Sequence, residues 1–189
     1  MTSKRNPVQA LGYGAVAGVL ASVAMAMYAM IAAWEKGIGF FTPLYHIESL
    51  WASQDSMMAS MKAAMGGSDF HFVFGTAVLG AVIHMMTGAV YGALFGLAVS
   101  GFDLKVAKLA GAGLVYGGLV FAISAFIGLP VAASIFNSGD QITHMAKMAG
   151  WGIFFVEHLI YGLTLGLVTA TAYRRSHAVA APQLATHGG

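Results

Sequence analysis

Three ionisable side chains lie deep within long apolar stretches of the sequence, namely His84, Glu157 and His158. An ionisable group inside a membrane-spanning segment is energetically costly and commonly marks a functional site. A single neutral histidine beside glycines more often forms a hydrogen bond between helices, so Glu157 is the stronger candidate. We expect Glu157 to face the interior of a helix bundle, a partner protein or an aqueous cavity. There it could serve a small transporter or a proton-linked carrier.

The two histidines are candidate ligands of a b-type haem. Imidazoles on two facing helices can ligate one iron, and each histidine starts the pattern His-x3-Gly-x3-Gly, whose glycines would leave room for the porphyrin. His158 follows Glu157 directly, so these two side chains point about 100° apart around a helix and cannot both serve one narrow interface. A hydrogen bond between His84 and His158 needs no cofactor and is the default expectation.

A second candidate metal site lies between the first two apolar stretches. Met57, Met61 and Met65 follow one another at intervals of four residues, with His46 upstream. Thioethers and imidazoles are ligands that suit Cu(I). The alternative is that these methionines fill the apolar face of a helix, because methionine adapts readily to irregular apolar contacts.

Other chemistry is excluded by composition or by the lack of a motif. The chain has no cysteine, which excludes disulfides, iron–sulfur clusters, thiolate zinc sites and covalently attached c-type haem. No nucleophile constellation, P-loop or dinucleotide fingerprint is present. The net charge of +2 is too small to suggest a nucleic-acid partner. The sequence therefore predicts no enzyme activity for the chain on its own.

The elements that hold these residues are predicted to cross a membrane. Hydrophobic residues make up 58% of the 189-residue chain and charged residues only 8%, with a mean hydropathy of +0.76, whereas a soluble domain carries about 25% charged residues. Four continuous apolar stretches each exceed the ~20 residues that a transmembrane helix needs, and a transmembrane β-barrel would alternate instead. The sequence thus predicts an all-α bundle of four spans in one domain, residues 1–175, with a flexible cytoplasmic tail at 176–189. The spans are expected at 8–34, 72–102, 106–129 and 148–173.

Residues 44–65 are predicted to form an amphipathic helix outside the membrane. Apolar side chains recur there at three- and four-residue spacing, and the opposite face is polar. We expect this helix to lie on the outer membrane surface or across the end of the bundle. Its expected packing face consists of Ile47, Leu50, Trp51, Gln54, Met58, Met61 and Met65.

Glycines recur every four residues within each predicted span, which places a stripe of small residues along one face of each helix. Such stripes let helix backbones approach closely in lipid, where packing drives association. We therefore expect these glycines to serve helix packing. They are Gly14 and Gly18 in the first span, Gly88, Gly92 and Gly96 in the second, Gly113 and Gly117 in the third, and Gly162 and Gly166 in the fourth.

The second and fourth predicted spans share the pattern His-x3-Gly-x3-Gly and cross the membrane in the same direction. The chain could therefore consist of two copies of a two-helix unit related by an axis along the membrane normal. In that alignment His84 matches His158, and Gly88 matches Gly162. The two histidines would then lie at similar depth and could face each other across the bundle.

The basic residues predict the orientation of the chain. The side that holds both termini would carry six of them, and the other side only Lys36, Lys62 and Lys147. The positive-inside rule then places both termini in the cytoplasm. The six basic residues are Lys4, Arg5, Lys105, Lys108, Arg174 and Arg175.

Three segments carry a resemblance to a known group of proteins: Gly14-Ala-Val-Ala-Gly18-Val-Leu-Ala-Ser22, Gly39-Phe-Phe-Thr-Pro43-Leu-Tyr-His-Ile47, and the repeated His-x3-Gly-x3-Gly. Over about residues 8–173 the chain resembles small uncharacterised bacterial membrane proteins with four helices. The resemblance implies a bacterial inner membrane and no known activity.

We expect the chain to be an accessory or structural subunit of a larger membrane complex, respiratory or photosynthetic. Catalytic groups are scarce, and every predicted span offers a small-residue stripe to a neighbour. An outer helix rich in methionine and aromatic residues would also suit a docking surface. The expected partners are membrane lipids and other membrane subunits. The alternatives are the Glu157 carrier and a membrane protein that binds haem b or copper.

Overall fold

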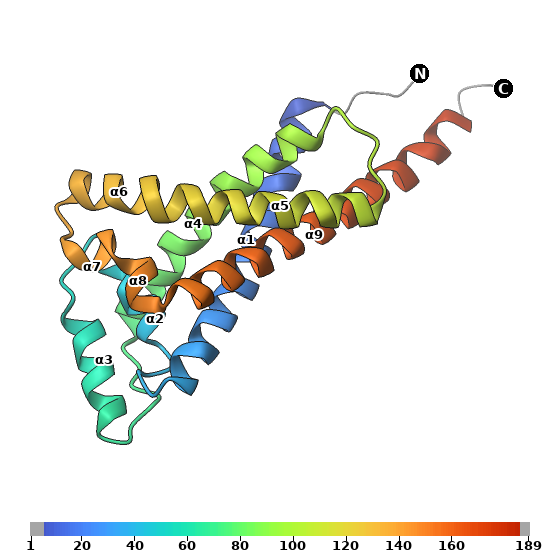
Figure 1. Cartoon of the computed structure of the whole chain (residues 1–189). Coiled ribbons are helices and arrows are strands. Elements are labelled where there is room, and N and C mark those ends of the chain that lie inside the picture. Colours follow the sequence, from blue (N-terminus) through green and yellow to red (C-terminus); the bar gives the residue numbers. More distant parts are fainter. Residues whose placement is uncertain (1–5, 186–189) are drawn as a thin grey trace.

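The computed structural model describes the backbone of residues 6–185 and the side chains of residues 6–174. This part of the chain is helical and contains no strand, as Figure 1 shows. The helices follow in the order α1 (Pro7–Glu35), α2 (Thr42–Glu48), α3 (Asp55–Met65), α4 (Phe74–Val99), α5 (Val106–Ile123), a π-helix (Ser124–Gly128), α6 (Leu129–Phe136), α7 (Asp140–Thr143), α8 (Met145–Ala149) and α9 (Trp151–Ala185).

Four helical runs within residues 6–185 are long and apolar enough to cross a membrane. They are Pro7–Glu35, Phe74–Val99, Val106–Phe136 and Trp151–Arg174. The predicted all-α bundle of four spans is therefore confirmed, and the chain is a membrane protein by length and hydropathy of its helices.

The third span is longer than the sequence predicts. The prediction ends it at residue 129, whereas α5 continues through the π-helix into α6 and ends at Phe136. Pro130 directly follows the π-helix, where the regular hydrogen-bond pattern of an α-helix is already interrupted: the N–H of Leu129 donates to the carbonyl oxygen of Ser124, five residues earlier. Asn137, with a φ of 52°, then takes the left-handed conformation that ends the helix.

The fourth span differs from its prediction at both ends. It begins at Trp151 and not at 148, because Gly150 has a φ of 94° and separates α9 from α8. At the other end α9 continues to Ala185, so the first part of the expected flexible tail is helical. Residues 186–189 of the expected tail lie outside the described residues, as do Lys4 and Arg5.

The glycine stripe of α1 packs directly on that of α4. A Cβ atom added to Gly14 would lie 2.3 Å from the carbonyl oxygen of Gly92, and one added to Gly18 would lie 2.1 Å from that of Gly88. No real Cβ approaches an atom so closely, so only glycine permits this backbone contact. The two helices form the first hairpin-like unit of the fold.

The second unit consists of α5 and α9, packed in the same way. A Cβ on Gly113 would lie 2.1 Å from the carbonyl oxygen of Gly162, and one on Gly117 would lie 2.3 Å from that of His158. Both units thus consist of two long helices joined by shorter ones, which is the architecture of a tandem repeat.

The backbone contacts of the two units agree with the register that the sequence predicts. A Cβ on Gly18 would lie 2.1 Å from the carbonyl oxygen of Gly88, and one on Gly113 would lie 2.1 Å from that of Gly162. Gly88 therefore matches Gly162 when Gly18 is matched with Gly113. A shift of one helical turn, which pairs Gly18 with Gly117, preserves the glycine contacts as well.

The two units pack asymmetrically. Helix α1 lies against much of α9, whereas α4 and α5 make few contacts beyond the loop that joins them. The short helices α2, α3, α7 and α8 gather at the end of the bundle away from the two chain termini (Figure 1). We call these four helices the cap. The space between the diverging helices beneath the cap holds the candidate site.

The outer amphipathic helix predicted at 44–65 is two helices, α2 and α3, with a turn between them. The predicted packing face is also wrong for α3, because Met58 and Met65 are 53% and 80% exposed while Met57 is 1% exposed. The buried face includes Ser60, whose hydroxyl lies 2.8 Å from that of Thr42 on α2. A hydrophobic pattern does not identify a face whose central contact is a hydrogen bond between hydroxyl groups.

Candidate functional site

A cavity of about 320 Å³ lies inside the bundle beneath the cap. Its wall comes from α1, α4, the run from α5 to α6, and α9, and the cap helices α2, α3, α7 and α8 contribute the rest. The three ionisable residues predicted from the sequence all line it: His84, Glu157 and His158. His46, Met57 and Met61 of the predicted copper site line the same cavity, whereas Met65 does not.

Glu157 is the buried acid of this cavity. Its side chain is on the second turn of α9, and the residue is only 5% exposed. Among the described residues no donor forms a hydrogen bond with its carboxyl oxygens, and the nearest basic atom is Nδ1 of His158, 3.9 Å from Oε1. That nitrogen donates elsewhere, so the carboxyl group has a neighbour but no hydrogen-bonding partner.

His158 is held in one orientation by its own helix. Its Nδ1 donates to the carbonyl oxygen of Phe154 at 2.6 Å, one turn earlier on α9. The ring also packs against the rings of Phe154 and Phe121, with centroid distances of 4.5 and 5.9 Å. Because a carbonyl can only accept, Nδ1 carries the proton, and Nε2 of the neutral ring keeps its lone pair.

His84 connects the two helices of the first unit. Its Nε2 donates to the carbonyl oxygen of Ser22 on α1 at 3.1 Å, which leaves the lone pair on Nδ1. His84 and His158 line the same cavity, and each ring bonds to a backbone carbonyl oxygen and not to the other ring. The structure thus brings both predicted haem ligands into one cavity. Their free nitrogens are Nδ1 of His84 and Nε2 of His158, and haem binding between them stays a prediction.

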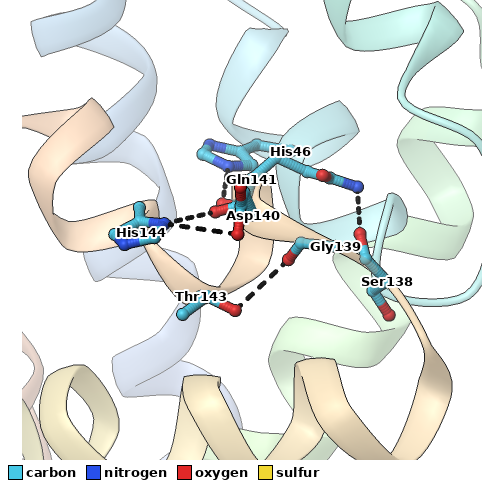
Figure 2. A network of polar contacts seen from close by, with 7 residues as sticks. All are labelled: His46, Ser138, Gly139, Asp140, Gln141, Thr143 and His144. Atoms are coloured by element: carbon cyan, nitrogen blue, oxygen red, sulfur yellow. Dashed lines mark hydrogen bonds and ion pairs between the residues drawn. The ribbon is translucent and has the colours of Figure 1, made fainter.

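His46 approaches the same cavity from the cap. Figure 2 shows its ring beside α7, where Nε2 donates to the carbonyl oxygen of Gln141 at 2.8 Å. Burial lowers the pKa of His46 from 6.5, and the bond to Gln141 opposes that shift only in part. The ring is therefore neutral near pH 7 and keeps a lone pair on Nδ1. The side chain of Gln141 in turn donates to the carbonyl oxygen of Ser138, which orders the turn before α7.

Thioether groups line the cavity from three helices. Met57 and Met61 come from α3, as the sequence predicts for a copper site, but Met65 points away and is largely exposed. Three other methionines line the cavity and could not be predicted from the sequence, because a methionine in an apolar stretch carries no distinguishing signal. These are Met25 on α1 and Met145 and Met148 on α8.

Most hydroxyl groups along the cavity use their protons elsewhere. Ser22 donates to Gly18 at 2.9 Å, Thr87 donates to Ile83 at 2.9 Å, and Tyr161 donates to Gly88 at 2.7 Å, each to a carbonyl oxygen. The polar groups that remain directed at the cavity are therefore mostly lone pairs. Such a lining suits a cation or a solute that donates hydrogen bonds.

The cavity is closed at one end and open at the other. Towards the chain termini, Tyr161 belongs to a buried cluster with Phe95 and Leu165 that fills the bundle. At the cap, the lining residues Lys36 and Met148 are exposed. The Lys36 ammonium group donates to the carbonyl oxygen of Ala149 at 2.7 Å and so ties the end of α1 to the end of α8 beside this opening.

One further buried acid lies outside the cavity. Glu48 on α2 is 6% exposed, and its Oε2 has no hydrogen-bond partner among the described residues. Burial raises the pKa of this carboxyl group above 4.5. Glu48 belongs to the polar face of the segment predicted as an amphipathic helix, so the sequence pattern does not indicate that it is buried.

Among the residues that the structure describes, no group of three or more His, Cys, Asp or Glu side chains is arranged to hold a metal ion. Any metal in the cavity would therefore need thioether ligands as well. No family model, curated protein or solved structure matches the chain. The cavity itself offers the available indication of function, namely the lone pairs of its imidazoles and the carboxyl group of Glu157.

Proposed function

We propose that the chain is a small membrane carrier that binds a cation in the intramembrane cavity and exchanges it for a proton on Glu157. The observation that carries this proposal is the position of Glu157, a buried carboxyl group that lines the cavity without a hydrogen-bond donor among the described residues. The alternative function predicted from the sequence, a proton-linked carrier using Glu157, is thereby favoured over the others.

The physical reason is the free energy of a buried charge. An ionised carboxylate in a low-dielectric site costs several kcal/mol unless a partner compensates it. Glu157 therefore has two stable states, one with a bound proton and one with a bound cation. Alternation between them exchanges one positive charge for another, and the cavity stays neutral in both.

The architecture supports a carrier for a second reason. Repeated helical units with a site between them, near breaks in the helices, are typical of secondary transporters. Two irregularities adjoin this cavity, the π-helix at Ser124–Gly128 and the break at Gly150 between α8 and α9. π-helices occur frequently at functional sites. A cavity that opens at the cap would correspond to one of the two states that alternating access requires.

The orientation is part of the proposal. The excess of lysine and arginine on the side of the termini supports cytoplasmic termini in a bacterial inner membrane. The cap and the opening of the cavity would then face away from the cytoplasm. A cation from outside would enter beside Lys36 and Met148 and reach Glu157 beneath them.

Proton flux in proteoliposomes tests the carrier. Vesicles loaded with a pH-sensitive dye are exposed in turn to K⁺, methylammonium and Ag⁺, and the internal pH is followed. Inward movement of a cation that the carrier accepts should make the lumen more alkaline. Glu157→Gln should abolish the signal, whereas Glu35→Gln, at the exposed end of α1, should not. A wild-type signal equal to that of protein-free vesicles for all three cations would refute the proposal, and so would normal flux by Glu157→Gln.

A role as an accessory subunit of a larger complex is a separate proposal. It is supported by exposed apolar side chains at the cap, which include Met58 and Met65. Such a patch suits a partner protein or the lipid interface. Purification in mild detergent from the native membrane should yield co-purifying subunits, and loss of these subunits in a Met58→Lys, Met65→Lys double variant would locate the contact.

A further inference from the structure

We infer that the cation which the cavity accepts is Cu(I). This inference rests on the proposed carrier for its transport step, but binding itself depends only on the cavity. It draws on the ligands that the fold brings together from six helices, α1, α2, α3, α4, α8 and α9.

The first argument is the number of thioethers. Five methionines line the cavity, from positions far apart in the sequence. Thioether sulfur is an uncharged soft ligand that selects Cu(I) over harder cations, and it is apolar enough to line a site within a membrane when no metal is bound. The five are Met25, Met57, Met61, Met145 and Met148.

The second argument is the arrangement of the imidazoles. His46, His84 and His158 each donate one ring N–H to a backbone carbonyl oxygen. Histidines that ligate metals nearly always donate their other nitrogen in this way, because the bond fixes the tautomer and the ring orientation. The second nitrogen of each ring is consequently an available ligand.

The third argument excludes other metals. Ca²⁺ and Mg²⁺ require several oxygen ligands, and structural or catalytic Zn²⁺ requires at least three nitrogen, sulfur or carboxylate ligands. No group of three His, Cys, Asp or Glu residues in the described part of the chain meets that requirement. Cu(I) accepts low coordination numbers, so one or two imidazoles with methionine sulfurs suffice.

The position of Glu157 adds an oxygen ligand to this set. Its carboxyl group lines the same cavity, and its Oε1 lies 3.9 Å from Nδ1 of His158. Copper remains in the +1 state and no electron is transferred. The other titratable groups that line the cavity are Lys36, His46, His84, Tyr91, His158 and Tyr161.

The opposing interpretation is that the methionines only fill space. The two interpretations differ in their response to leucine, which matches methionine in volume and apolarity but cannot ligate a metal. The test variant is therefore Met57→Leu with Met61→Leu in the cavity wall. Its matched control is Met58→Leu with Met65→Leu, on the exposed face of the same helix.

The experiment is a competition for Cu(I). The purified full chain, kept anaerobic with a reductant, is titrated against the coloured Cu(I) complex of bathocuproine disulfonate. Wild-type protein and the control variant should remove one Cu(I) per chain from the chelator. The cavity variant should bind roughly 10–100-fold more weakly, in the range seen when groups around a metal site are altered. Thermal unfolding without copper should be alike for all three, which shows that the substitutions leave the fold intact.

Two outcomes would overturn the inference: wild-type protein that removes no copper from the chelator, or equal loss of binding in the cavity and control variants. The experiments also distinguish failure of the proposed transport from failure of Cu(I) as the transported cation. Copper binding without proton flux driven by Ag⁺, K⁺ or methylammonium would leave the site in place and refute the carrier. Proton flux driven by K⁺ or methylammonium, without copper binding, would leave the carrier in place and refute Cu(I) as its cargo.

Discussion

The contact between α1 and α4 depends on glycine at position 18, and Gly18→Ala tests whether this contact holds the first unit together. A Cβ there would lie 2.1 Å from the carbonyl oxygen of Gly88 and 2.9 Å from the carbonyl carbon. The neighbouring atoms belong to the backbone of a long helix, so no side chain can rotate away. The two helices themselves would have to separate.

The magnitude follows from that separation. An ordinary carbon–oxygen contact is about 3.3 Å, so the helices must move apart by roughly 1 Å at this point. A gap of 0.5–1 Å forfeits about a quarter to a half of the dispersion energy of each contact, and overpacking typically destabilises a protein by about 1–3 kcal/mol. We expect Gly18→Ala to fall near the upper end of this range, because the separation also weakens the bond between His84 and the Ser22 carbonyl.

Unfolding of detergent-solubilised protein in sodium dodecyl sulfate, followed by circular dichroism and tryptophan fluorescence, would measure the change. The control is Gly12→Ala on the same helix, where an added Cβ meets no atom within 4 Å. Alanine is the better helix former by about 1 kcal/mol in water, so the control should be neutral or slightly stabilising. Equal stability of Gly18→Ala and wild type, or equal destabilisation by both variants, would refute the packing argument.

Three further substitutions have expected outcomes outside the membrane-spanning helices. Burial holds the pKa of His46 below 6.5, so the unfolded chain binds the proton more readily and stability should fall as the pH drops through about 6.5; His46→Gln should flatten this part of the stability–pH curve. Burial raises the pKa of Glu48 above 4.5, so stability should fall as the pH rises from there; Glu48→Gln should be more stable than wild type at neutral pH in the same unfolding assay. The hydroxyl of Tyr45 donates to the His71 carbonyl at 2.9 Å and accepts from the Val73 N–H at 2.8 Å. Tyr45→Phe should therefore cost about 1–3 kcal/mol and speed amide hydrogen exchange at the start of α4.

The four spans could be predicted from the sequence because hydrophobicity over twenty residues is a strong signal. Their ends could not, because the chain departs from regular helix there for local reasons. The π-helix carries the third span past Pro130, and a positive φ at Gly150 delays the start of the fourth. Neither the π-helix nor the backbone conformation of Gly150 changes the mean hydropathy of a segment, so the ends of these two spans cannot be predicted from hydropathy.

The cap was predicted less well, because its packing relies on polar contacts. The pattern of large apolar residues favours Met58 and Met65 as buried, yet α3 turns Met57 and Ser60 inward. Ser60 fits beside Gly39 and its hydroxyl meets that of Thr42. A buried hydroxyl pair is invisible in a hydrophobic pattern, because each residue on its own reads as exposed.

Only the ionisable residues of the candidate site could be predicted from the sequence, and the reason is physical. Ionisable groups are rare in apolar stretches, so His84, Glu157 and His158 stand out in the sequence and all three line the cavity. Methionines do not stand out among other apolar residues. Met25 and Met145 share a cavity with the histidines only through the tertiary fold, so sequence spacing suggested the local trio Met57, Met61 and Met65 instead.

The carboxyl group of Glu157 explains how a duplicated scaffold forms a site that is not duplicated. A glycine stripe with a period of four can slide by one turn, about 6 Å, and still match glycine with glycine. In the alignment that matches His84 with His158, Glu157 corresponds to Ile83, and one turn away it corresponds to Thr87. The first unit offers no carboxyl group at this position in either register. The two units share the packing that lets their helices approach, and the carboxyl group of the cavity comes from a position at which they differ.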